Sequence, residues 1–414
     1  MKSKYDVIII GCGTSAGFLL SFLRSSGAAK LDILILERTA KAFRKIRASG
    51  NGRCNYSNID FSENRYFSFS ADLEWKRKAF ESVLNLNLRD YFFHAGIPSR
   101  TDEYGRIFPF TNSANTIAEY FDNCIRAAGA EFQPNSEVTR VDRDNVTGKY
   151  RVDWKNLEDN STVTAATDKI IFAAGGSAHP NLGTDGSAFG ILTALGHKVT
   201  QQLPGIVPLE TPHKEFHKLD GLKMETEITF KDFRRTGELL FTNYGISGPN
   251  TLYASNTISV SLAKGPVNIM VNFLPDNSFT LDYFSGLWKD SSQKTLLDVF
   301  RGALQSRFID GFLGFIANGS RHRGKLNEKQ LKEVYGMLTR CPMQVTKTRK
   351  FDEAQVSLGG VRTDEVKPES FESVLHKNLF ILGEALDYTG ETGGYNIHWC
   401  AATAQKTAES LLNK

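Results

Sequence analysis

A glycine-rich turn near the amino terminus constrains the fold of this chain more than any other feature of its sequence. The apolar run at 7–10 predicts a parallel strand buried on both faces, and the apolar run at 18–23 predicts a helix. In the turn between them, Gly11, Gly13 and Ala16 have the spacing of a dinucleotide-binding motif. The first glycine makes the turn, the second lets the backbone approach a pyrophosphate, and the third, small residue lets the helix pack on the strand.

An acidic residue closes the next predicted strand. Residues 31–36 are largely apolar, and Glu37 follows them, 21 residues after Ala16. A carboxylate at this place accepts hydrogen bonds from ribose hydroxyls, and the helix N-terminus offers free N–H groups to phosphates. We therefore expect a strand–helix–strand unit that binds a dinucleotide.

The remaining chain predicts a domain that is interrupted by another. Buried strands at 169–176 and 379–384 run into glycines and match the doubly wound style of the amino terminus. From about residue 201 the pattern changes to short alternating strands (226–230, 267–271) and then to a helical stretch at 296–338. We therefore predict an α/β fold with a discontinuous, Rossmann-like (doubly wound) domain at 1–195 and 347–414 and an insertion at 196–346. Smaller predicted elements are helices at 119–128 and 400–412 and strands at 138–141, 150–154 and 356–361.

Two further loops suit a nucleotide cofactor. Residues 44–58 combine glycines, amides and four cations directly after the acidic strand end, and such a loop offers N–H groups and positive charge. Residues 390–399 are glycine-rich and precede an alanine-rich helix, whose N-terminus would stabilise negative charge on a reduced flavin ring. The alternatives are a solvated basic loop and a plain loop before a terminal helix.

Composition excludes several classes of protein. Fifty basic residues against 46 acidic ones give a formal net charge of +4, too small an excess to predict a nucleic-acid partner. The five cysteines form no C-x-x-C pair and no metal-ligand spacing, which favours reduced thiols, a reducing compartment and no metal site. We find no signal peptide and no uninterrupted apolar run of about 18 residues, so we expect a cytoplasmic protein without a membrane span.

Motifs spread over the chain carry a resemblance to a known family. They are Ser-Gly-x-Gly-Arg-Cys-Asn at 49–55, Gly-Arg-Ile-Phe-Pro at 105–109, Thr-Asp-Gly at 184–186, Gly-Glu-Leu-Leu-Phe-Thr at 237–242 and Thr-Gly-Gly-Tyr-Asn at 392–396. With the glycine turn they resemble, nearly from end to end, a family of bacterial FAD-dependent oxidoreductases that includes aminoacetone oxidase and a bile-acid dehydro reductase-like flavoprotein. The resemblance implies an FAD-binding domain made of both chain ends, an inserted β-rich domain and a small helical domain.

The resemblance also implies which residues bind FAD, which we expect to be held non-covalently. The turn at 11–17 would hold the pyrophosphate, Glu37 the adenosine ribose and the backbone of Val138 the adenine. The ribityl and phosphate end would lie at 383–384, and the flavin ring at 396–397. The full predicted set is Gly11, Gly13, Thr14, Ser15, Ala16, Gly17, Glu37, Arg38, Lys45, Ser49, Gly50, Asn55, Val138, Ala174, Gly175, Gly383, Glu384, Gly394, Asn396 and Ile397.

The chain departs from the usual pattern of that family at five positions. The family usually has glycine and threonine where this chain has Ala16 and Ala174, threonine and alanine where it has Ser357 and Leu358, and proline where it has Glu391. The last two changes fall where the flavin ring and the substrate are expected. The resemblance therefore does not carry over a particular substrate.

No motif singles out catalytic residues. The polar residues most suited to face a substrate are His179, Tyr388, Tyr395 and His398, although each equally suits a packed or flavin-supporting role. His213 and His217 have the i, i+4 spacing of a helical metal site but lack a third ligand. The basic run at 321–325 suits a solvated loop better than a phosphate or RNA contact.

Flavin chemistry leaves two enzyme hypotheses open. One is a reductase that is fed by NAD(P)H and saturates an activated C=C bond of a small molecule; without a second glycine motif, NAD(P)H would dock only transiently. The other is an oxidase that takes hydride from an amine and passes electrons to oxygen. A third hypothesis, of another class, is a flavin-binding protein that acts with RNA, motivated by the mild positive charge and the run at 321–325.

Overall fold

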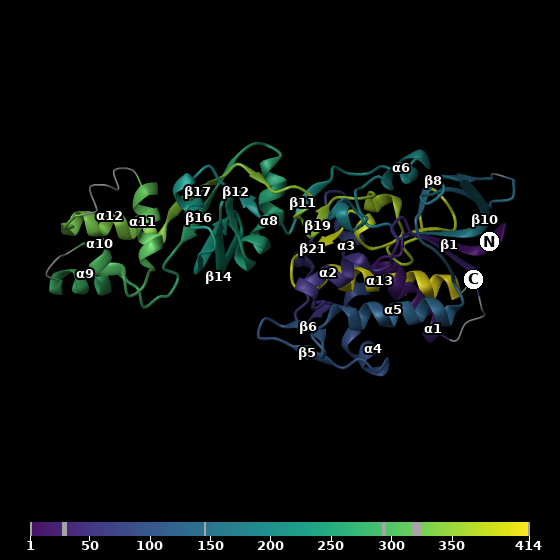
Figure 1. Cartoon of the computed structure of the whole chain (residues 1–414), viewed down its shortest axis with the longest axis horizontal. Helices are drawn as coiled ribbons and strands as arrows, with labels where there is room; N and C mark the ends of the chain where they lie inside the picture. The colour runs from purple at the N-terminus through teal and green to yellow at the C-terminus, as the bar shows by residue number, and fades with distance from the viewer. Residues whose placement is uncertain (1, 27–30, 145, 292–294, 317–323, 413–414) are drawn as a thin grey trace. The chain divides into compact units, whose positions relative to one another are not determined.

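The computed structural model describes residues 2–26, 31–144, 146–291, 295–316 and 324–412 (Figure 1). They form two compact units, one made of Met1–Leu203 and Val356–Lys414 and the other of Pro204–Gln355. The α/β class with a discontinuous Rossmann-type unit is therefore confirmed. In the described part of the chain, no helix is both long and apolar enough to span a membrane.

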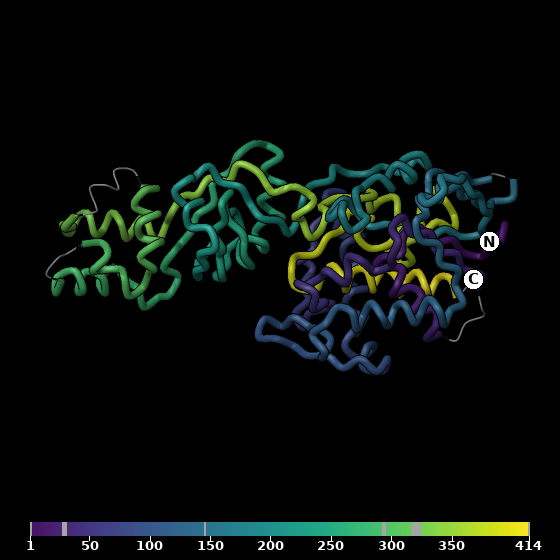
Figure 2. The backbone as a smooth tube through the Cα atoms, in the orientation of Figure 1, coloured from purple at the N-terminus to yellow at the C-terminus, as the bar shows by residue number. Residues whose placement is uncertain are grey.

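The first unit is built on a seven-stranded sheet with the order β7-β2-β1-β10-β9-β8, in which β20 also pairs with β10. β2 and β20 are buried along their whole length, which explains their unbroken apolar sequence. Because β20 pairs with the carboxyl end of β10, the C-terminal part of the chain completes a sheet that the N-terminal part begins. In Figure 2 the C-terminal part (yellow) and the N-terminal part (purple) lie in the same unit. The parallel strands are β1 (Lys4–Ile10), β2 (Ile33–Leu36), β7 (Glu131–Gln133), β10 (Thr162–Phe172) and β20 (Leu379–Ile381), and the antiparallel ones are β8 (Ser136–Arg143) and β9 (Tyr150–Asn156).

Helix α1 (Thr14–Ser25) packs against two other helices of this unit, α5 (Ala114–Ala128) and α13 (Tyr395–Leu412). A Cβ atom on Gly17 would lie 2.4 Å from the ring of Phe121, so only glycine allows α1 to come this close to α5. The other helices are α2 (Arg44–Gly52), α3 (Leu73–Leu84), α4 (Leu88–His94) and α6 (Phe189–Ala194). The short strands are β3 (Ser57–Asn58), β4 (Tyr66–Phe67), β5 (Ser99–Thr101), β6 (Arg106–Pro109), β11 (Leu203–Gly205), β19 (Val356–Leu358) and β21 (Thr389–Gly390).

The second unit is an antiparallel sheet with helices. Its seven strands have the order β17-β16-β13-β14-β15-β12-β18, and α8 (Pro249–Leu262) packs on β13 and β14 (Figure 1). The strands are β12 (Leu209–Glu210), β13 (Lys223–Phe230), β14 (Phe233–Thr242), β15 (Gly245–Ser247), β16 (Val267–Asn272), β17 (Cys341–Val345) and β18 (Lys347–Thr348). The further helices are α7 (Lys214–His217), α9 (Leu281–Asp290), α10 (Leu296–Phe300), α11 (Ser306–Phe315) and α12 (Glu328–Thr339).

The insertion begins and ends later than the predicted 196–346, because local pairing assigns the flanking residues differently. Val199 bridges Val361, and the amide of Thr200 donates to the carbonyl of Gly360, which keeps residues 196–203 with the first unit. β18 pairs with β12, which keeps residues 347–355 with the second unit.

Candidate functional site

The glycine turn stands between β1 and α1, as its sequence predicts. Gly11 has φ +90°, and a Cβ atom there would lie 2.7 Å from the backbone of Ala174 at the end of β10. The N-cap residue Gly13 offers no side-chain hydrogen bond, and the first turn of α1 holds no acidic residue. The first N–H groups of α1 are thus free of side-chain acceptors at the N-cap, which suits them to bind an anion.

Glu37 is fixed beside this turn by three donors. One carboxylate oxygen accepts from the amide of Cys12 at 2.8 Å, and the other accepts from the amide and the hydroxyl of Thr39, each at 2.8 Å. These bonds hold the carboxylate at the end of β2 with lone pairs left for a further donor. The position is the one expected of a ribose-binding acid.

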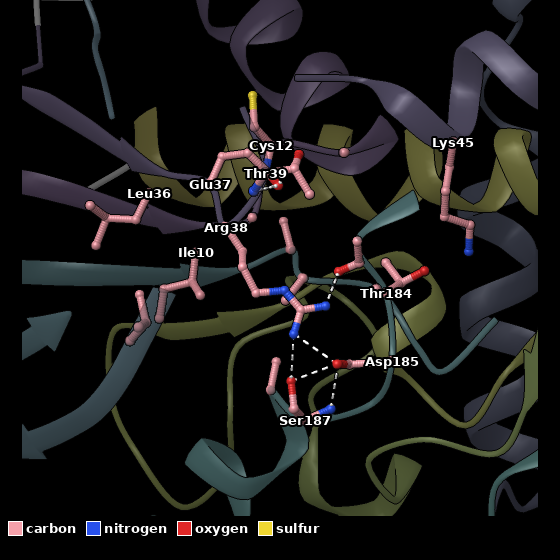
Figure 3. Close-up of a pocket in the computed structure, with 18 of the residues that line it drawn as sticks. Ile10, Cys12, Leu36, Glu37, Arg38, Thr39, Lys45, Thr184, Asp185 and Ser187 are labelled. Atoms are coloured by element: carbon pink, nitrogen blue, oxygen red, sulfur yellow. Dashed lines mark hydrogen bonds and ion pairs between the residues drawn. The ribbon is translucent and has the colours of Figure 1, made fainter. Parts of the chain in front are cut away.

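A cavity of about 390 Å³ joins these features (Figure 3). It is lined by the turn, by residues 36–39, by the start of β8 and by residues 182–188 after β10. Of the predicted cofactor residues, those that line it are Gly11, Gly13, Thr14, Ser15, Glu37, Arg38, Lys45, Val138, Ala174, Gly175 and Glu384. The cavity also includes Cys400, which no sequence motif had marked.

An ion pair between distant parts of the chain lies in the wall of this cavity. Lys45 Nζ is 2.7 Å from Glu384 Oε2, and the other oxygen of Glu384 accepts from the amide and hydroxyl of Ser357. The Ser357 hydroxyl in turn accepts from the amide of Ser177 at 3.0 Å. Lys45, Ser177, Ser357 and Glu384 are therefore held together although four separate segments supply them.

The two loops predicted to suit a cofactor meet each other. Asn58 Nδ2 in the first loop donates to the carbonyl of Gly393 in the second at 2.9 Å. Within the second loop, the side-chain amide of Asn396 accepts from the Gly390 N–H and donates to the Gly390 carbonyl, each at 2.8 Å. Asn55 Oδ1 is buried between these loops' residues and has no hydrogen-bond partner among the described residues. A buried acceptor left open in this way suits a donor on a bound ligand.

The departure at Glu391 has a structural explanation. Its carboxylate lies 3.2 Å from Arg65, and its amide donates to the Arg65 carbonyl at 2.8 Å. The Arg65 guanidinium also lies over the Tyr395 ring, 5.4 Å from its centroid. An ion pair thus fixes the loop before α13 in a position where the family usually has proline.

All four candidate catalytic residues belong to the first unit, and three of them are buried there. Tyr388 stacks on Tyr66 with ring centroids 5.0 Å apart, Tyr395 donates its hydroxyl to the carbonyl of Asp60 at 2.9 Å, and His398 is 1% exposed. His179 is half-buried with φ +60° and is not among the described residues that line the cavity. A catalytic role of any of them stays a prediction.

The protonation of His398 follows from its partners. Nε2 lies 3.1 Å from the carbonyl of Val83, which can only accept, so Nε2 carries the proton and Nδ1 accepts from Ser57 at 2.8 Å. Burial lowers the pKa of His398 to about 4. The ring is therefore neutral near pH 7.

This low pKa predicts a pH-dependent stability. Between pH 6.5 and 4 the unfolded chain binds a proton at His398 that the folded chain excludes, so the free energy of unfolding falls with pH, by at most about 3 kcal/mol. Stability from this group is complete above pH 6.5 and its loss is complete below pH 4. Urea unfolding at several pH values gives the free energy of unfolding as a function of pH. Its slope against pH should be smaller for His398→Gln than for the native chain, and unchanged for His94→Gln, an exposed control. An equal slope in all three proteins would contradict the prediction.

The histidines and cysteines that were weaker candidates for a metal or thiol site have other surroundings. His217 Nε2 lies 2.9 Å from the carbonyl of Thr211, and His213 Nε2 accepts from the amide of Gln344 at 3.1 Å. Among the residues that the structure describes, no group of three or more metal-ligating side chains comes together. Burial raises the pKa of Cys54 to about 12 and that of Cys12 well above its ordinary value, which disfavours thiolate chemistry. Most of the basic run at 321–325 lies outside the described residues.

Comparisons with known proteins agree with this geometry. The model of the family described as "HI0933-like protein Rossmann domain" matches residues 5–410. The "3-dehydro-bile acid delta(4,6)-reductase" of Clostridium scindens is 27% identical over 95% of this chain and 96% of its own. The "Ribosomal RNA dihydrouridine synthase" of Escherichia coli is 29% identical over 99% of this chain and 98% of its own. Among solved structures, 3-ketosteroid delta1-dehydrogenase from Sterolibacterium denitrificans shares the fold with a TM-score of 0.53, at 11% identity and with both chains covered completely.

Proposed function

This chain belongs to the HI0933-like Rossmann family, and on that premise we propose that it is an FAD-dependent oxidoreductase that reduces a C=C bond conjugated to a carbonyl group. The observation that carries the proposal is the cavity that brings the glycine turn, Glu37 and the Lys45–Glu384 pair together. FAD, when bound, would supply the hydride chemistry, and the chain binds and orients it.

The residues present fit FAD. The turn at 11–17 offers helix N–H groups to a pyrophosphate, and Glu37 is held where a ribose hydroxyl would donate to it. Lys45 adds a cation beside the same cavity, and the open acceptor of Asn55 suits a ring N–H of the cofactor. We propose that the isoalloxazine end extends toward the loops at 49–58 and 390–396.

The reaction class is suggested by the names of two relatives. A delta(4,6)-reductase of a 3-dehydro bile acid adds hydrogen to a C=C bond next to a ketone, and formation of dihydrouridine adds hydrogen to the ring C=C bond of uridine. Both bonds are conjugated to a carbonyl, which makes them hydride acceptors. We extend this shared chemistry to the present chain.

Anaerobic half-reactions test the proposal. We expect NADPH or NADH to bleach the absorbance of the FAD-loaded protein, and a 3-oxo-4-ene steroid or a uridine-containing RNA to restore it. The alternative hypothesis, an amine oxidase, predicts bleaching by aminoacetone and reoxidation by oxygen, with no effect of the unsaturated compounds. That second pattern would overturn the reductase proposal.

A uridine in RNA is the second candidate substrate. The relative from Escherichia coli covers almost the whole chain, and the second unit carries 20 basic against 16 acidic residues, so the whole charge excess of +4 lies in it. A fragment of ribosomal RNA that reoxidises the reduced flavin, with a rate that falls as salt rises, would favour this candidate. Reoxidation by the steroid alone would remove it.

A further inference from the structure

The Thr-Asp-Gly motif at 184–186 has no part in the chemistry proposed above, yet it forms one wall of the cavity. Its Asp185 carries a carboxylate that faces Arg38, the residue directly after Glu37 (Figure 3). Arg38 Nη1 lies 2.8 Å from Asp185 Oδ2 and 3.1 Å from Ser187 Oγ, and Nη2 donates to the carbonyl of Gly183 at 2.9 Å. One side chain at the end of β2 thus binds three residues of the segment at 183–187.

The same segment is bonded on its other side to the end of β10. The amide of Gly186 donates to the carbonyl of Gly176 at 3.1 Å, and the Thr184 hydroxyl donates to the carbonyl of Ala178. Asp185 also shapes the segment from within, because its second oxygen accepts from the amide and hydroxyl of Ser187. The segment at 183–187 is therefore held in two ways. One set of bonds joins it to the residues that follow β10, and the other joins it to Arg38 across the cavity.

Charge favours the attachment across the cavity. Asp185 and Glu137 both lie near the Arg38 guanidinium, at 2.8 and 3.6 Å, and the Arg38 side chain is only 25% exposed. Burial would raise the pKa of Asp185, but the hydrogen bonds from Arg38 and Ser187 outweigh it and lower the pKa to about 2. The Arg38–Asp185 pair is therefore ionised at neutral pH.

We infer that Asp185 is a positioning residue that holds Arg38 across the cavity and thereby makes residues 183–187 a clasp over the adenosine half of FAD. This inference rests on the proposed FAD-binding function. The glycine turn, Glu37 and residues 183–187 line the same cavity, so the contacts of Arg38 with Asp185 and Gly183 would slow the departure of a dinucleotide bound there. The clasp controls how fast FAD enters and leaves, rather than how FAD reacts.

Stopped-flow fluorescence of FAD binding and release tests the clasp. For Asp185→Asn and Arg38→Gln in the full chain, we expect release at least about tenfold faster than from the native protein, with association unchanged or faster, because a weakened clasp opens more readily. Raised ionic strength should speed release from the native protein and have little effect on either variant. The double variant should be no worse than the more affected single variant, since both changes break one contact.

The matched control is Asp142→Asn, which breaks the exposed Arg140–Asp142 pair of 2.7 Å on β8 and should leave both rates unchanged. The inference is overturned if both cavity variants release FAD within twofold of the native rate, or if their association slows together with a lower melting temperature. A native chain that binds no FAD would remove the proposed function itself, and the clasp with it.

Discussion

Replacement of Gly11 by alanine is expected to abolish FAD binding and to destabilise the protein. A side chain at φ +90° costs about 1–3 kcal/mol, and the added Cβ would lie 2.7 Å from backbone atoms of Ala174, which cannot rotate away. Displacement of the turn would cost about 1–3 kcal/mol more and would move the N–H groups that we propose to bind the phosphates. The absorbance ratio of flavin to protein after purification, and the melting temperature, measure both effects.

The control for this change is Gly196→Ala. Gly196 has φ +92°, almost the same as Gly11, but a Cβ atom there would meet nothing within 4 Å. It should therefore reproduce the backbone strain, lower the melting temperature moderately, and leave FAD content intact. If Gly11→Ala retained a full complement of FAD, the turn would not be the pyrophosphate site.

Glu37→Gln is expected to weaken FAD binding about 100-fold, equivalent to about 2.7 kcal/mol. Each carboxylate oxygen of Glu37 accepts an amide N–H, from Cys12 or from Thr39, so either orientation of a glutamine would direct its NH₂ group against a donor. The variant loses a hydrogen bond inside the protein and the charge that favours a ribose hydroxyl. Titration of the apoprotein with FAD, followed by fluorescence, gives the dissociation constant.

Glu131→Gln is the matched control for this second change. Glu131 is the first residue of β7 in the same sheet. Its carboxylate accepts from Tyr5 at 2.6 Å and from Gln133 at 3.0 Å, but it is not among the residues that line the cavity. Both partners can reverse or rotate their polar groups, so the variant should bind FAD normally. Equal dissociation constants for Glu37→Gln and the native protein would exclude Glu37 from the ribose site.

The sequence predicted the parts of the site that depend on local pattern. The strand, the glycine turn and the strand ending at Glu37 are read from adjacent residues, and the structure places them as one unit. The family resemblance added Lys45 and Glu384, which lie 2.7 Å apart although they are far apart in the chain. Long-range proximity of this kind leaves no trace in periodicity or spacing.

Element boundaries and partners were harder to predict. The terminal helix was expected from residue 400, after a glycine-rich loop, but it begins at Tyr395, because Tyr395, His398 and Trp399 lie on its buried face. The helix expected from residue 119 begins at Ala114, since Ala114 and Ile117 continue its buried face past two polar residues. The partners of Asp185 and Glu391 come from other segments, so no local rule could have assigned them.

The pairing of β20 with β10 has a consequence for biosynthesis. During translation the strands β1, β2 and β10 leave the ribosome well before residues 356–414, which supply β20, Glu384 and α13. Until residues 356–414 emerge, the carboxyl end of β10 in the first unit lacks its partner β20, whereas the second unit, a continuous stretch at 204–355, has already been synthesised. Nascent chains tend to fold domain by domain as they emerge. Cofactor capture would therefore require residues 356–414 to have emerged, and a chain truncated before them would lack β20 as a partner of β10 and Glu384 in the lining of the cavity.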